Sequence, residues 1–184
     1  MSNQFKTILF LSLCFFTSHA LMGQRSIRLP QFEKLANCAD HSSFDTEARK
    51  LGYSYLRKDP RKERDKYVYV KEMETKEMEF TLHLSYLDYG DDRPVILFMC
   101  SSNALPNQIL DLKKDIGKPG SNYKAQDRDC KEKHDNPLMA SSVENNYLAF
   151  CFESKTHDLR LYDYPRKNKS GNRYNEYRVR INRR

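Results

Sequence analysis

The sequence predicts an α+β protein in which helices pack on one side of an antiparallel sheet. Apolar residues recur at helical spacing in the first part of the chain after the N-terminal leader, and again near residue 110. Elsewhere, apolar and polar residues alternate over short segments, which is the pattern of half-buried strands. Polar turns join several of these segments, so consecutive strands are expected to form an antiparallel meander.

The N-terminus is typical of a secretory signal. Lys6 supplies positive charge, residues 7–16 form an apolar run, and Gly23 offers a small residue for cleavage. The apolar run is too short to span a bilayer. We therefore expect a signal peptide over residues 1–23, a secreted extracellular protein without a membrane anchor, and one α+β domain over 24–184.

Two helices are expected at the start of this domain. Apolar residues at helical spacing predict the first between Leu29 and about Cys38. The second is expected to be capped by Ser43 and ended by Gly52. The highly charged stretch 57–66 that follows is expected to be a solvated connector.

Strands are expected from residue 66 onward. Alternation predicts strands over 67–72 and 80–86, and the continuous apolar run 94–100 suits a strand that is buried on both faces. Another amphipathic helix is expected between Ile109 and Ile116, where Gly117 stops it.

The rest of the chain begins with a long polar segment. Residues 118–144 are expected to form a surface loop. Strand patterns return over 147–152, 158–164 and 174–182.

The order helix, three strands, helix, three strands suggests an internal α-β-β-β duplication, with repeats over 24–103 and 104–184. A single six-stranded sheet with two helices and no duplication is the alternative. The strand-like segments of the two halves correspond in position: 67–70 with 147–150, 80–86 with 159–164, and 93–98 with 178–182.

Four cysteines remain after the leader, namely Cys38, Cys100, Cys130 and Cys151. An even number in an exported chain predicts up to two disulfides, and three connectivities stay open. No two of the four are spaced as Cys-x-x-Cys, and no phosphate-binding or metalloprotease motif occurs, so neither a metal nor a cofactor is expected.

The positive charge is concentrated at the C-terminus. The whole chain has a formal net charge of +7, and residues 166–184 contain eight Lys and Arg residues against the single acid Glu176. Such a cluster attracts phosphate backbones, acidic proteins or anionic surfaces. Alternatively, a basic tail only keeps an exported protein soluble.

The last two predicted strands carry arginines and tyrosines at alternate positions, so these side chains share strand faces. Aromatic and arginine side chains together can stack bases and hold phosphates, although cross-strand packing would use the same residues. The candidate nucleic-acid-binding residues are Arg160, Tyr162, Tyr164, Arg166, Lys167, Arg178 and Arg180.

The same region resembles the core of the fungal guanyl-specific ribonucleases. Tyr162-Asp163-Tyr164-Pro165 is followed by a polar turn with glycine, by Tyr174 and by Arg178-Val179-Arg180-Ile181-Asn182. In that family, a strand reading Tyr-x-Glu-aromatic-Pro precedes a strand reading Arg-Val-Val-Ile/Phe-Asn. The same scaffold recurs in the ribonuclease-like secreted effectors of powdery mildew fungi, to which Cys38 followed by a helix is also similar. The resemblance implies a ribonuclease-like fold.

The resemblance also implies roles for particular residues. It places Asp163 where the family has its general base and Arg178 where it has its phosphate-binding arginine. Asp163 is one methylene shorter than the glutamate of the family, and the strand that carries the family's histidine acid would follow Asn182, where this chain is two residues from its end. His157 is the remaining candidate acid, about 20 Å from Asp163 along an extended strand. A degenerate site without hydrolysis is therefore expected.

These observations lead to one expected function and two alternatives. We expect a secreted, non-catalytic effector or virulence protein that binds host RNA, a ribonucleoprotein or an acidic host protein through its basic C-terminal face, outside the host cell or inside it after delivery. The alternatives are a secreted ribonuclease with a rearranged active site, and an extracellular bacterial binding or inhibitor protein built on a helix-and-sheet repeat. The oligomeric state is not indicated by the sequence.

Overall fold

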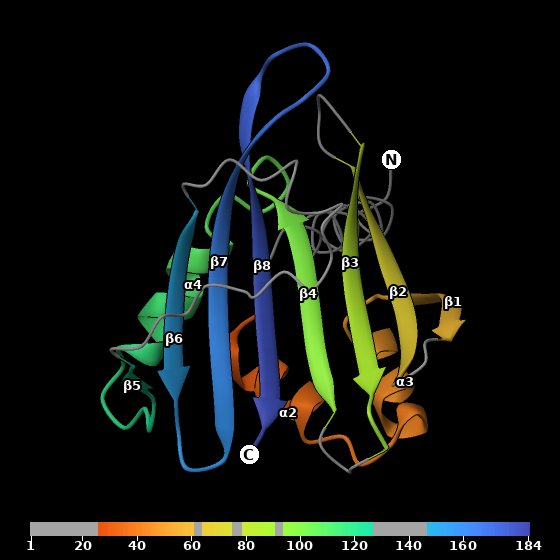
Figure 1. Ribbon diagram of the computed structural model, residues 1–184, viewed down its shortest axis with the longest axis vertical. Coiled ribbons are helices and arrows are strands. Elements are labelled where there is room, and N and C mark those ends of the chain that lie inside the picture. The colour runs from red at the N-terminus through yellow and green to blue at the C-terminus, as the bar shows by residue number, and fades with distance from the viewer. Residues whose placement is uncertain (1–25, 61–63, 75–78, 91–93, 127–146) are drawn as a thin grey trace, which may run out of the picture.

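The computed structural model describes residues 26–60, 64–74, 79–90, 94–126 and 147–184. Within these ranges the chain forms three α-helices and one eight-stranded sheet, and every strand pairing is antiparallel (Figure 1). The predicted α+β class with an antiparallel sheet is confirmed. The predicted signal peptide and Cys130 lie outside the described residues.

Two helices open the domain, α2 (Leu29–Ala36) and α3 (His41–Lys50). Asp40 caps α3, because its Oδ1 accepts a hydrogen bond from the Ser43 backbone N–H at 2.7 Å. Ser43, the predicted cap, is instead the third residue of the helix and completes a capping box with Asp40. Several residues of capping type stand next to one another here, and tertiary packing decides which of them starts the helix.

The first half continues with four strands, β1 (Ser54–Pro60), β2 (Asp65–Glu74), β3 (Glu79–Asp88) and β4 (Val95–Ser101). The predicted connector over 57–66 is wrong in part, because β1 occupies its beginning. As an edge strand β1 can expose its charged side chains and tolerate Pro60 at its end, so it lacks the alternation that signals a strand.

The second half contains one helix, α4 (Gln108–Ile116), and four strands. The helix ends before Gly117, as predicted. The strands are β5 (Lys124–Ala125), β6 (Leu148–Glu153), β7 (His157–Lys167) and β8 (Arg173–Arg183).

The strand order across the sheet is β1-β2-β3-β4-β8-β7-β6-β5. The two halves therefore meet where β4 pairs with β8, and each half contributes four consecutive strands. Strands β2, β3 and β4 occupy places that correspond to those of β6, β7 and β8. The sheet thus replaces both the predicted three strands per half and the alternative of six strands in all.

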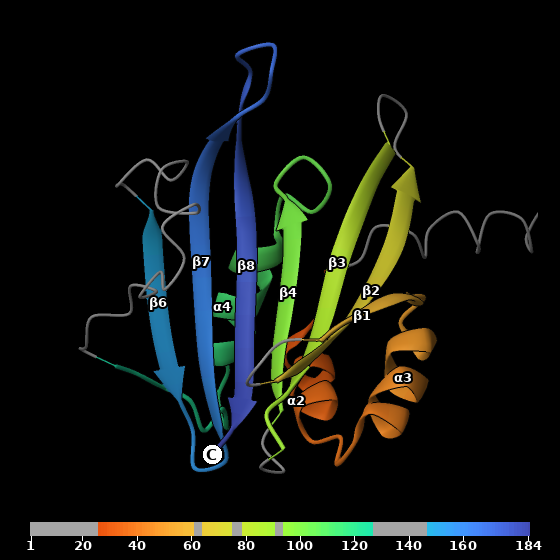
Figure 2. The same cartoon turned by 45° about the vertical axis from the view of Figure 1, so that its right-hand side comes forward.

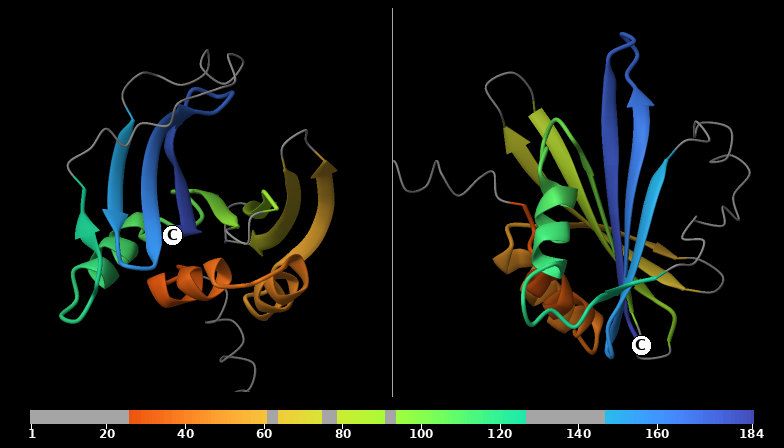
Figure 3. Two further views of the ribbon diagram at one scale, coloured as in Figure 1. Left: turned by 60° about the horizontal axis from the view of Figure 1, so that its bottom comes forward. Right: turned by 90° about the vertical axis from the view of Figure 1, so that its left-hand side faces the viewer.

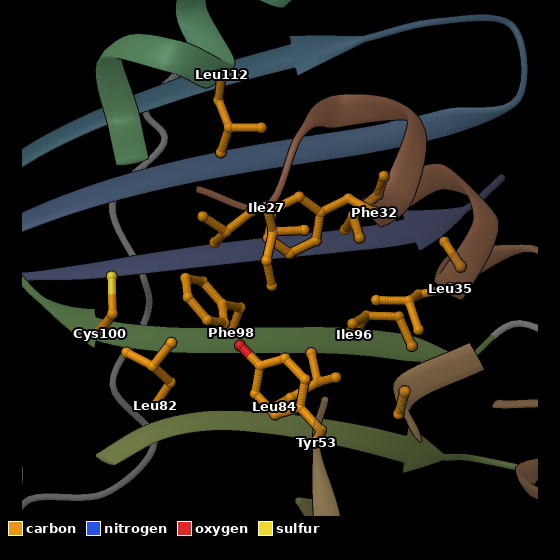
Figure 4. Packing of buried hydrophobic residues seen from close by; sticks show 14 of the residues in the cluster. Ile27, Phe32, Leu35, Tyr53, Leu82, Leu84, Ile96, Phe98, Cys100 and Leu112 are labelled. Carbon is orange, nitrogen blue, oxygen red and sulfur yellow. The ribbon is translucent and has the colours of Figure 1, made fainter. Parts of the chain in front are cut away.

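The core lies between the helices and the sheet. Figure 3 shows α2, α3 and α4 on the same face of the sheet, and Figure 4 shows the apolar side chains that fill the space between these layers. Phe32 of α2 and Phe98 of β4 meet there edge to face, with ring centroids 5.7 Å apart. Leu112 of α4 and Ile181 of β8 are buried in the same cluster, so the helices and the sheet of both halves share one core.

The turn between α3 and β1 depends on Gly52. Its φ is +84°, and a Cβ at this position would lie 3.3 Å from Cε and Nζ of Lys71. We expect Gly52→Ala to lower the free energy of unfolding by about 1 kcal/mol, because an L-residue is strained at this φ. Urea denaturation measures the effect. Gly117→Ala is the matched control, since Gly117 ends a helix at an ordinary φ of −78°. Equal losses in the two variants would contradict the prediction.

Candidate anion-binding face

The candidate site lies on the face of β7 and β8 that is turned away from the helices. Alternate residues of both strands, such as Leu161 and Val179, enter the core, so their neighbours point to the opposite face. The register places Arg160 opposite Arg180, and Tyr162 opposite Arg178. We call this surface the β7–β8 face; its residues are Arg160, Tyr162, Tyr164, Arg166, Tyr174, Glu176, Arg178 and Arg180.

Two arginines of this face are directly opposed. Arg160 and Arg180 form a cross-strand pair, and like charges in that position destabilise a sheet. Their outer neighbours in the register, Cys151 on β6 and Leu97 on β4, carry no negative charge. The Nε atoms of both arginines are buried and, within the described part of the chain, have no hydrogen-bond acceptor. An anion held between the two guanidinium groups would supply the missing acceptors and relieve the repulsion.

The other arginines of the face share one carboxylate. Glu176 Oε1 accepts a hydrogen bond from Arg178 Nε at 2.7 Å and lies 3.4 Å from a terminal nitrogen of Arg166. Both guanidinium groups also lie over the ring of Tyr164, with their Cζ atoms 4.6 Å and 5.6 Å from its centroid. Glu176 therefore balances one of these two charges. Near the opposed arginines the same face carries Asp158, two residues before Arg160 on β7, and its Oδ1 lies 3.7 Å from Nε of Arg184.

The tyrosines of the face are packed against one another. The ring of Tyr164 stacks on Tyr147 at 4.7 Å and on Tyr162 at 5.9 Å between centroids. Tyr162 and Tyr164 are both fully buried, with 0% of their surface exposed. Their predicted role in base stacking is therefore wrong for this conformation, and the alternative of cross-strand packing describes them.

The basic surface continues onto a projecting hairpin. Pairing with β6 ends at Asp163 and pairing with β4 ends at Glu176. Residues 165–167 and 173–175 continue as a two-stranded ribbon, which Ser102 contacts only at Asn175. Figure 2 shows this two-stranded projection beyond the neighbouring ends of β4 and β6. The exposed cations at its end are Lys167, Lys169 and Arg173.

The structure separates the predicted general base from the predicted phosphate-binding arginine. Asp163 pairs with Tyr177 and belongs to the helix side of the sheet, where Lys113 of α4 acts on its charge. Burial raises the pKa of Asp163, while a hydrogen bond from Asn175 and the charge of Lys113 oppose that rise. Arg178 is the next residue after Tyr177 and therefore points to the opposite face. The catalytic pair implied by the ribonuclease resemblance is not assembled.

His157 is a structural residue in this fold. It is buried at the start of β7, with Nε2 3.0 Å from Asn37 Oδ1 and Nδ1 2.9 Å from Thr156 Oγ1. Burial lowers its pKa, which favours the neutral ring. Asp163 lies six residues further along the same extended strand, which places the two residues about 20 Å apart. The candidate acid role of His157 therefore has no support in the geometry.

Two of the four disulfide candidates are free thiols. Cys38 is buried just after α2, and Cys100 is buried on the core side of β4. The prediction that these two cysteines form disulfides is wrong, because the fold places them in separate parts of the apolar layer, and burial raises the pKa of both thiols. Cys151 on β6 is disulfide-bonded.

Among the described residues no three His, Cys, Asp or Glu side chains gather in a way that could hold a metal ion. None of the helices in the same ranges is long and apolar enough to cross a membrane.

The predicted binding residues did not include Tyr174 and Glu176 of the β7–β8 face, nor Tyr147, whose ring stacks on Tyr164. Glu176 stands two residues before Arg178 on an alternating strand, and this spacing was the available signal that they share a face. For Tyr147 no such signal exists, because it contacts Tyr164 from another segment of the chain.

No protein-family model, curated protein or solved structure matches this chain.

Proposed function

We propose that the protein binds a polyanion without cleaving it, and that the phosphodiester backbone of single-stranded RNA is its partner. The observation that carries this proposal is the opposed pair Arg160 and Arg180, whose buried Nε atoms have no acceptor among the described residues. A guanidinium group matches a phosphate with two parallel hydrogen bonds, so one phosphate can satisfy both the charge and the geometry of this pair.

The length of the basic surface favours a polymer over a single phosphate. From Arg160 to Lys167 the strand rises about 23 Å, and further cations follow at Lys169 and Arg173 on the hairpin. A single-stranded nucleic acid can place successive phosphates along such a line. Since Tyr162 and Tyr164 are buried, binding is expected to depend on the backbone and to show little base preference.

The separation of Asp163 from Arg178 supports binding without cleavage. A ribonuclease with a rearranged site would need a base and an acid on the arginine side of the sheet. Glu176 lies there, and so does His83 of β3. His83 pairs with Met99 of β4, and Met99 in turn pairs with Arg178 of β8. Glu176 is already engaged by two arginines, however, and serves there as an ion-pair partner.

Under this proposal the protein is a secreted, non-catalytic effector or virulence protein that acts on host RNA or a ribonucleoprotein. The ribonuclease-like scaffold remains a proposal that rests on the resemblance within residues 162–182. A second candidate is an extracellular bacterial binding or inhibitor protein built on an internal duplication. The observation that favours it is the strand order, in which two runs of four strands extend outward from the β4–β8 contact.

The first test is the binding of a labelled single-stranded RNA, measured by fluorescence anisotropy over a series of salt concentrations. The double variant Arg160→Gln/Arg180→Gln is expected to bind about tenfold or more weakly. Its log affinity should also fall less steeply with log salt, by about 1.4 in slope, if each arginine contacts one phosphate. The control Arg49→Gln/Arg57→Gln removes two charges from α3 and β1 and is expected to change little.

Each result discriminates between the candidates. Equal weakening in the control variant would show that net charge alone, and not the β7–β8 face, governs binding. No retention of RNA at low salt, together with binding of polyglutamate, would replace the RNA proposal with an acidic protein partner. Cleavage of the RNA that is lost in Glu176→Gln or His83→Gln would establish a ribonuclease instead.

A further inference from the structure

A cavity of about 930 Å³ lies on the helix side of the sheet, away from the β7–β8 face. Its wall is formed by the N-terminal part of α2, the turn between α3 and β1, strands β2 and β3, and the segment that links β4 to α4. This volume is within the range of about 300–1,000 Å³ that is usual for small-molecule sites. Met73, Leu82 and Leu105 give the wall an apolar area.

Lys71 brings a cation into this wall. It occupies a core-facing position of β2, between Tyr69 and Met73, both of which are buried. Its Nζ donates a hydrogen bond to the Leu51 carbonyl at 3.0 Å and lies 6.0 Å from the ring centroid of Tyr53. Gly52 leaves room for the end of this side chain, since a Cβ there would approach Lys71 to 3.3 Å.

The described charges around the cavity are paired with groups other than Lys71. Arg28 pairs with Asp115, and Lys50 pairs with Glu47. Asp111, the carboxylate of the wall, lies 4.0 Å from Lys114. Among the described residues no carboxylate lies within ion-pair distance of Lys71. A partly buried ammonium group is costly unless it is paired, so this position favours a negatively charged ligand group.

Tyr53 supplies a second polar group. It is 2% exposed, and its hydroxyl has no hydrogen-bond partner within the ranges that the structure describes. Figure 4 shows this hydroxyl directed toward β4, from which Phe98 and Cys100 project. A buried phenol normally finds an acceptor, because leaving it unpaired costs free energy.

We propose that this cavity binds a small amphiphilic carboxylate that carries a second polar group. The carboxylate pairs with the Lys71 ammonium, the hydrocarbon part packs against Met73, Leu82 and Leu105, and the second polar group accepts a hydrogen bond from the Tyr53 hydroxyl. This assigns the helix side of the protein a ligand that is chemically distinct from the polyanion of the other face.

Isothermal titration calorimetry with decanoate, 10-hydroxydecanoate and decanol tests the proposal on the full chain. Saturable binding of both carboxylates is expected, with decanol bound at least about tenfold more weakly. Lys71→Met, which keeps most of the side-chain length, is expected to reduce the affinity for decanoate by about tenfold or more. Lys113→Met is the matched control, because Lys113 is also partly buried and lies over Phe150, outside the cavity.

Tyr53→Phe tests the second contact. The wild-type protein is expected to prefer 10-hydroxydecanoate to decanoate, and the variant should lose this preference while it still binds decanoate. Absence of decanoate binding by the wild-type protein, or equal affinities for decanoate and decanol, would overturn the proposal. Equal reductions of the decanoate affinity in Lys71→Met and in Lys113→Met would also overturn the proposal. None of these outcomes affects the RNA proposal, which concerns residues on the opposite face.

Discussion

Replacing Phe98 with alanine is expected to lower the free energy of unfolding by about 4 kcal/mol. Phe98 is fully buried on β4, next to the contact between the two halves of the sheet, and its ring packs edge to face on Phe32. The substitution removes the burial of a large side chain and leaves a cavity that the surrounding layers cannot fill. Denaturation with guanidinium chloride, followed by circular dichroism, measures the loss.

Leu110→Ala is the control for this substitution. Leu110 lies on α4 but is 50% exposed, so its truncation should change the free energy of unfolding by less than about 0.5 kcal/mol. A loss of under about 1 kcal/mol for Phe98→Ala would mean that the two layers are not packed as described. The position matters because Phe98 and Val179 are paired across the β4–β8 contact, on the core side of the strand that carries Arg178 and Arg180.

Asp115→Asn is expected to have the second largest effect, a loss of about 2–3 kcal/mol at neutral pH. Asp115 is buried on α4 and joins the helices of the two halves. Its Oδ2 accepts hydrogen bonds from Arg28 Nε at 2.7 Å and from the Leu29 backbone N–H at 3.2 Å, while Oδ1 accepts from Lys118 Nζ at 2.7 Å and from Arg28 Nη2. Asparagine cannot provide a charge, and its single carbonyl oxygen cannot replace both acceptors.

The loss caused by Asp115→Asn should depend on pH. The bonds from Arg28, Lys118 and Leu29 hold the pKa of Asp115 far below its value of about 3.9 in an unfolded chain. The carboxylate therefore contributes its full stability above about pH 5, and this contribution falls as the pH drops through the unfolded value toward the folded one. Unfolding measured between pH 7 and pH 2 should show the wild-type and variant curves converging in acid.

Asp111→Asn is the control for the pH series, because Asp111 lies one turn away on α4 and only approaches Lys114 at 4.0 Å. Its curve should stay close to that of the wild type throughout. A gap between wild type and Asp115→Asn that stays constant from pH 7 to pH 2 would show that the loss does not come from the charge of the carboxylate.

The sequence predicted most helices and strands because their signals are local. The run around Leu82 and Leu84 alternates with polar residues, and one side of β3 is indeed buried. Local signals failed for β1, whose charged residues are exposed at the sheet edge. They also failed for the cap of α3, where Asp40 and Ser43 are both suitable.

Local sequence signals also predicted only part of the candidate site. That Arg178 and Arg180 share a strand face follows from the period of two. Asp163 and Arg178 lie on opposite faces of the sheet. This follows only from the strand register, which pairs Asp163 with Tyr177, the residue before Arg178. The resemblance to ribonucleases identified both residues by type and spacing, and it carried no information on which side of the sheet each would lie.

The sequence by itself determined the α+β class, most of the elements, and the placement of the positive charge on the last two strands. These properties depend on residues near one another in the chain. Only the tertiary structure decided that Arg160 opposes Arg180, that Tyr162 and Tyr164 are buried, and that Lys71 and Tyr53 line one cavity. Each of these depends on strand register or on packing between distant segments, because burial and pairing arise only when the sheet and the helices meet.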